Sequence, residues 1–92
     1  MIVDELRYCA YIQEQGVGAN DKVASSVKSY VSYLNSVSRL LDEKIDSNLI
    51  RSENDIKKIL YSLKGKRASN TLNNYKSALN QYLKFLKNEK KI

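Results

Sequence analysis

Amide, hydroxyl and lysine side chains recur every three or four positions in the last third of the chain, which makes this the segment best suited to bind an anion. The positions are Asn73, Lys76, Ser77, Asn80, Lys84 and Lys87. Residues three and four apart share one side of an α-helix, so we expect a common face that carries no acid. Cations and amides hydrogen-bond to phosphates and to base edges in the major groove of DNA. The pattern therefore predicts a helix face that binds nucleic acid.

Two further groups of polar residues extend this candidate site. The loop before the helix contains Lys64, Lys66 and Arg67, beside a helix N-terminus whose free N–H groups favour phosphate. A second helix, expected over residues 21–43, presents Lys28, Ser32 and Arg39 on its outer side. We expect the loop and the two helices together to clamp the phosphates of double-stranded DNA, with sequence-tolerant or moderately specific binding.

The charge of the chain is unevenly distributed. The formal net charge is +6, but residues 1–46 hold five Lys/Arg against seven Asp/Glu, and residues 47–92 hold eleven against three. A directional excess of this kind favours a nucleic-acid partner. A lysine-rich surface with no such role gives similar totals, so the charge alone leaves both interpretations open.

The residue types needed for catalysis are scarce. The chain has no histidine and one cysteine, so the commonest general base and the usual zinc ligands are missing. The two glycines of Gly16-Val17-Gly18 lack the rest of a dinucleotide-binding motif, and Cys9 is best interpreted as a small core residue. We expect no enzymatic activity, no cofactor and no bound metal. A lone cysteine and the lack of a long apolar run favour a cytoplasmic location.

The composition predicts an all-α chain, because it contains no proline and three glycines. Apolar spacing places helices over about residues 2–15, 21–43, 53–63 and 70–87. The expected N-caps are Asn20 or Asp21 for the second helix, Ser52 with Asp55 for the third, and Ser69 for the fourth. The last helix should bury Leu72, Tyr75, Leu79, Tyr82, Leu83, Phe85 and Leu86, and the connector over 44–51 should bury Ile45, Leu49 and Ile50.

The first helix supports an alternative function. Its weakly apolar side is expected to contain Ile2, Leu6, Cys9 with Ala10, and Gln13. Apolar residues nevertheless occur on more than one of its faces. We expect a partner-binding surface at Leu6, Tyr8, Tyr11 and Ile12. The alternative is therefore a protein-interaction or homodimerisation module, such as a regulator or inhibitor carried by a phage or mobile element.

Three segments carry a resemblance to a known family. They are SVKSYVSYL over residues 26–34, IRSENDIKKIL over residues 50–60, and the closing helix, with Ser69 to Leu72, Ser77-Ala78-Leu79 and Tyr82 to Leu86. From about Lys22 onward, over about three quarters of the chain, this order resembles the N-terminal core-binding domain of tyrosine recombinases and phage integrases.

The resemblance implies a compact four-helix SAM-like bundle, here with an extra or extended N-terminal helix. It divides the single domain into residues 1–20 (helix and glycine turn), 21–88 (core-binding-like helices) and 89–92 (basic tail or linker start). In that family the catalytic residues belong to a second domain, so the resemblance implies DNA binding without strand cleavage. The sequence leaves open whether the chain is part of a recombinase or nuclease or stands alone on a mobile element.

Overall fold

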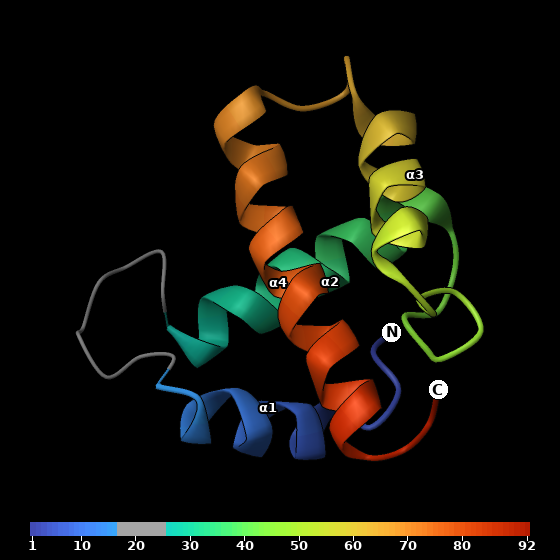
Figure 1. The fold of residues 1–92 in the computed structure, drawn as a ribbon. Helices are drawn as coiled ribbons and strands as arrows, with labels where there is room; N and C mark the ends of the chain where they lie inside the picture. Colours follow the sequence, from blue (N-terminus) through green and yellow to red (C-terminus); the bar gives the residue numbers. More distant parts are fainter. Residues whose placement is uncertain (17–25) are drawn as a thin grey trace.

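Helix α4, Ser69–Asn88, is the longest element, and the other helices pack against it (Figure 1). The computed structural model describes residues 1–16 and 26–92. These residues also form α1 (Glu5–Glu14), α2 (Val27–Leu41) and α3 (Glu53–Leu63), together with two isolated β-bridges. The expected four-helix, all-α fold is confirmed.

The inner face of α4 supplies the centre of the core. Its buried residues are Tyr75, Ala78, Leu79, Tyr82, Leu83, Phe85 and Leu86. Leu72, also expected in the core, is half-buried and packs against it. The spacing of three and four residues therefore predicted this face correctly, because one side of a long helix must be covered by the rest of a small domain.

Helix α1 packs a different side than its sequence predicts. Tyr8 and Ile12 are fully buried, whereas Leu6 is 83% exposed. The Tyr8 ring lies 5.4 Å from the Tyr82 ring and 6.0 Å from the Phe85 ring, measured between centroids. Aromatic rings bury more apolar surface than a leucine, so contacts with α4 decide which side of α1 faces inward. Tyr8 and Ile12 are therefore core residues, and the expectation that they form a partner surface is wrong.

Three more details of α1 correct the sequence analysis. Cys9 is half-buried, not a core residue, and Gln13 is exposed. The helix begins at Glu5 because Asp4 adopts a left-handed conformation with φ of 58°. Ile2 is buried, as expected, but it precedes the helix and reaches the core as extended backbone.

The segment before α1 pairs with the connector between α2 and α3. The Val3 N–H donates to the Ile45 carbonyl at 2.9 Å, and the Ile45 N–H donates to the Met1 carbonyl at 2.9 Å. The Tyr82 hydroxyl lies within 2.9 Å of the Val3 carbonyl and 3.1 Å of the Ile45 carbonyl. Ile45 and Ile50 are buried, as the sequence predicts, whereas Leu49 is half-buried and packs against the core. One tyrosine of α4 thus contacts both segments of the pairing.

The helix N-caps differ from the expected ones. Helix α2 begins after Ser26, whose hydroxyl accepts the Ser29 N–H at 3.0 Å; the expected caps Asn20 and Asp21 lie outside the described residues. Ser52 is the N-cap of α3 as expected, but its side chain makes no capping bond. The Asp55 carboxylate accepts the Arg51 N–H instead, at 2.9 Å. Helix α4 starts one residue early, with Ala68 as N-cap and Ser69 already helical.

The C-terminal end of α4 is closed by backbone hydrogen bonds and tied to α1. The N–H groups of Lys90 and Lys91 donate to the Lys87 and Leu86 carbonyls at 3.1 and 2.9 Å. This is a Schellman motif, with Lys90 in the left-handed region at φ of 57°. Ion pairs join Arg7 to Glu89, and Asp4 to Lys91 at 3.7 Å. The start of α1 is therefore held beside the end of α4 (Figure 1).

We expect the fold to lose stability in alkali through its buried tyrosines. Burial raises the pKa of Tyr8 and of Tyr82 above the ordinary tyrosine value of 10.0. Above about pH 10 the unfolded chain releases these protons while the folded chain retains them. Each pH unit in that range then lowers the free energy of unfolding by about 1.4 kcal/mol per tyrosine.

The measurement is urea unfolding of the parent and of Tyr8→Phe at about pH 9 and about pH 11. The variant should lose less stability between the two values than the parent, because a phenylalanine ring has no proton to release. Tyr61→Phe, at a position that is 78% exposed, is the matched control and should behave as the parent. Equal losses in the parent and in Tyr8→Phe would contradict this explanation.

Candidate nucleic-acid interface

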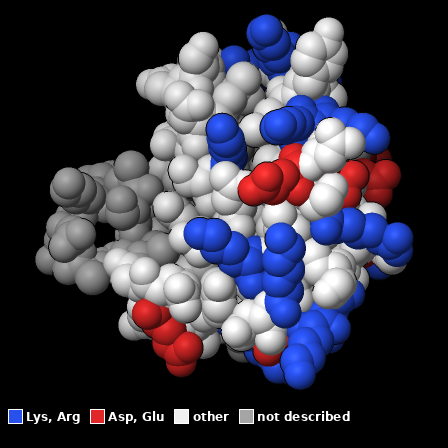
Figure 2. Space-filling model, in the orientation of Figure 1, with Lys and Arg blue, Asp and Glu red and all other residues white. Residues whose placement is uncertain are grey.

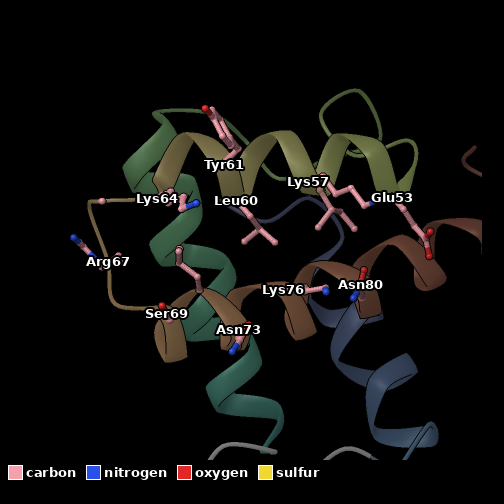
Figure 3. Close-up of a pocket in the computed structure, with 13 residues that line it drawn as sticks. Glu53, Lys57, Leu60, Tyr61, Lys64, Arg67, Ser69, Asn73, Lys76 and Asn80 are labelled. Carbon is pink, nitrogen blue, oxygen red and sulfur yellow. The ribbon is translucent and has the colours of Figure 1, made fainter.

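A groove of about 630 Å³ runs between α3 and α4 and is bordered at one end by the loop over residues 64–68 (Figure 3). Each wall comes from one helix, because both helices bury their apolar sides in the shared core and leave their polar edges facing the gap. The lining residues are Glu53, Ile56, Lys57, Leu60, Tyr61, Lys64, Gly65, Arg67, Ser69, Leu72, Asn73, Lys76 and Asn80. The groove thus combines cations, amides and an apolar floor.

The residues that form the α3 wall recur at the spacing of one helical turn. Ile56 is buried and Leu60 is half-buried, so their side chains form the floor. Lys57 and Tyr61 lie one turn apart on the same wall, and both are exposed. The Tyr61 ring extends away from α4 at the rim of the groove (Figure 3). An exposed cation and an exposed ring therefore stand together on this wall.

The α4 wall presents amides and a cation. Asn73 and Lys76 are exposed, and Asn80 is half-buried further along the helix. Leu72 is half-buried and meets the floor from this side. Lys57 and Lys76 therefore line the groove from opposite walls (Figure 3).

The loop at the end of the groove needs one glycine. Gly65 has φ of +92°, a conformation that side chains rarely adopt, and the Lys66 N–H donates to the Leu63 carbonyl at 3.0 Å. The Arg67 guanidinium donates to the Lys66 carbonyl at 2.7 Å. This tight turn places Lys64 and Arg67 beside the N-terminal turn of α4, where both line the groove.

The groove cations have no acidic partner in the described part of the chain. The ion pairs found within residues 1–16 and 26–92 are those of Arg7 with Glu89 and Asp4 with Lys91, at the opposite end of α4. One acid, Glu53, lines the groove near the start of α3. Figure 2 shows several Lys and Arg side chains over this face, with a smaller acidic group among them. Unpaired cations on two walls make the groove suitable for an anion with several charges.

The structure brings together part of the expected DNA-binding set. The groove is lined by Lys64, Arg67, Asn73, Lys76 and Asn80. The expected residues outside it are Lys28, Ser32, Arg39, Lys66, Ser77, Lys84 and Lys87, all exposed. The last three continue the polar stripe of α4 beyond the groove, although the Ser77 hydroxyl donates to the Asn73 carbonyl at 3.2 Å. The α2 residues Lys28, Ser32 and Arg39 do not line the groove.

Sequence reasoning missed the contribution of α3. Lys57 and the acid Glu53 were not in the expected site. The sequence favours exposure of Tyr61 and contact of its side chain with a phosphate or a partner, but Tyr61 was not assigned to the site either. A signal was present, because Lys57, Tyr61 and Lys64 recur at spacings of four and three directly before the basic loop. This spacing was not enough by itself to predict a binding site, since a lysine-rich helix face is usually only solvated.

These observations define a small all-helical domain with a cationic groove between its last two helices. The family model described as "Phage integrase, N-terminal SAM-like domain" matches residues 7–90, and the chain belongs to this family. No curated protein and no solved structure matched the chain. The match starts at Arg7 instead of at about Lys22, so it covers more of the chain than the motifs indicated and includes most of α1.

Family membership suggests a DNA-binding role in recombination. It also identifies the chain as the small N-terminal domain of such proteins and not as the catalytic domain. Within the part of the chain that the structure describes, no helix combines the length and the hydropathy needed to cross a membrane.

Proposed function

We propose that this domain binds double-stranded DNA through the α3–α4 groove and the polar stripe of α4, and that it does not itself cleave a strand. The observation that carries the proposal is the placement of unpaired cations on both walls of one groove, with Lys57 on α3 and Lys76 on α4. Lys57 and Lys76 would contact the phosphates of a DNA backbone in the groove from two sides. Contacts of this kind fix the position of a protein on DNA and supply most of its affinity.

The remaining residues of the site divide by role. Lys64 and Arg67 would hold a phosphate near the N-terminal turn of α4, where the free backbone N–H groups also favour an anion. Asn73 and Asn80 would supply hydrogen bonds to phosphates or to base edges, which would give the domain a limited sequence preference. Lys84 would extend the contact along α4. The α2 residues Lys28, Ser32 and Arg39 would form a secondary contact, outside the groove.

We expect DNA binding to weaken strongly with salt. If Lys57, Lys64, Arg67, Lys76 and Lys84 each neutralise one phosphate, a plot of log K against log salt concentration should have a slope of about −4.5. The measurement is fluorescence anisotropy of a labelled duplex at several salt concentrations. A slope near zero would show that affinity does not come from phosphate contacts and would overturn the proposal.

The alternative function, a protein-interaction or dimerisation surface on α1, has a narrower structural basis. With Tyr8 and Ile12 in the core, the apolar residues of α1 that remain accessible are Leu6, Ala10 and the half-buried Cys9 and Tyr11. Removal of residues 1–16 would take Ile2, Tyr8 and Ile12 from the core and unfold the domain. The groove is therefore the better-supported site of function.

A further inference from the structure

Tyr61 is the one aromatic side chain that the fold leaves largely in solvent. Its surface is 78% exposed, whereas the other six tyrosines and Phe85 are buried or half-buried. It makes none of the ring contacts that connect the other aromatic residues in the described part of the chain. Packing in the core therefore does not explain why this position has an aromatic side chain.

Tyr61 lies between two cations along α3, at the rim of a groove whose floor is apolar. Lys57 precedes it by one turn and Lys64 follows it by three residues, and all three line the groove. The floor beside them contains Leu60 and Leu72, which are half-buried and so leave apolar surface open to the groove. A site that holds only phosphates needs neither an exposed ring nor an apolar floor.

A positively charged groove beside an exposed aromatic ring is the arrangement that binds single-stranded nucleic acid. Cations follow the backbone in such sites, and bases released from a duplex stack on the ring. The two walls run for twelve residues each, Glu53 to Lys64 and Ser69 to Asn80, which is about 18 Å of helix. That length suits a short stretch of strand.

We infer that the α3–α4 groove also binds a single DNA strand, with phosphates held by Lys57 and Lys76 and a base stacked on Tyr61. This inference rests on the proposed function, because both use the same groove cations. It adds a second form of DNA and a residue that duplex binding does not require. The apolar floor would contact sugars or the faces of bases, and these base faces are covered by stacking in a duplex.

The test compares a labelled oligodeoxythymidine, which forms no duplex, with a labelled duplex in anisotropy titrations at one low salt concentration. The proteins are the parent, Tyr61→Ala, Tyr61→Phe and the control Leu6→Ala, whose position on α1 is similarly exposed. We expect Tyr61→Ala to bind the single strand at least about five-fold more weakly than the parent. Tyr61→Phe should bind as the parent, because stacking uses the ring and not the hydroxyl. Duplex affinity should be the same in all four proteins.

The outcomes separate this inference from the proposed function. If the parent binds the duplex but not the single strand, the inference fails and the proposed function stands. It also fails if Tyr61→Ala binds the single strand as the parent does, or loses affinity for both forms equally. If the parent binds neither form at low salt, the proposed function itself fails. Thermal unfolding of each variant confirms that it is folded at the titration temperature.

Discussion

Reversing the charge of Lys57 and Lys76 together will lower duplex affinity by about 100-fold or more at low salt. Each substitution to glutamate removes a charge-assisted hydrogen bond, worth about 1.5–3 kcal/mol, and places an acid where a phosphate would lie. The two lysines line the groove from opposite helices, so the double variant removes contact from both walls. The salt slope should also become less negative by about two units. Anisotropy titrations of labelled duplex at several salt concentrations measure both effects.

The matched control is the double variant Lys44→Glu/Lys58→Glu. Both of these lysines are exposed and neither lines the groove, yet the net charge of the protein changes by the same amount. The control should keep most of the parent affinity. If it loses as much as the groove variant, binding follows the overall charge, and the assignment of the interface to the groove is wrong.

Replacing Tyr82 by alanine will destabilise the domain by about 4–6 kcal/mol. Truncating a buried aromatic ring costs about 3–5 kcal/mol, and the lost hydroxyl leaves the Val3 and Ile45 carbonyls with fewer hydrogen bonds. Small domains have a total stability of about 5–15 kcal/mol, so this variant should be largely unfolded at moderate temperature. Urea unfolding followed by circular dichroism gives the value.

Two other variants show whether the ring or the hydroxyl of Tyr82 is responsible for the loss of stability. Tyr82→Phe keeps the ring and should lose about 1–2 kcal/mol. Tyr61→Ala removes a ring that is 78% exposed and should change stability by less than about 0.5 kcal/mol. A small loss in Tyr82→Ala would contradict the placement of this ring among Tyr8, Phe85 and the N-terminal pairing.

The parts of the fold that were predictable are those determined by local pattern. Helix α3 and the inner face of α4 follow from apolar residues three and four apart, and they match the structure closely. The face of α1 was not predictable in this way. Its sequence supports two overlapping stripes, one through Leu6 and one through Tyr8 and Ile12. The choice depends on the Tyr82 and Phe85 rings of α4, which lie 74 and 77 residues beyond Tyr8 in the chain.

The same distinction applies to the site. The stripe of α4 and the basic loop could be identified from residue types, because they are continuous in sequence. The groove forms between two helices that are separate in sequence. Lys57 lies opposite Lys76 only because α3 packs against α4, and the sequence pattern of either helix does not show this packing. The pairing of Ile2 with Ile45 was also not predictable, because neither short segment has a sequence pattern that identifies the other as its partner.

The hydrogen bonds of the Tyr82 hydroxyl also have a consequence for folding during synthesis, because they join distant parts of the chain. They join residues 79 and 37 positions apart, and the first of them closes one of the longest loops that the chain allows. Contacts between distant residues slow folding, and synthesis proceeds from the N-terminus. While the ribosome makes the earlier helices, the Tyr82 and Phe85 rings, against which Tyr8 packs, are still missing. The core becomes complete only once α4 has been synthesised, and we expect a chain that stops before Tyr82 to remain unfolded.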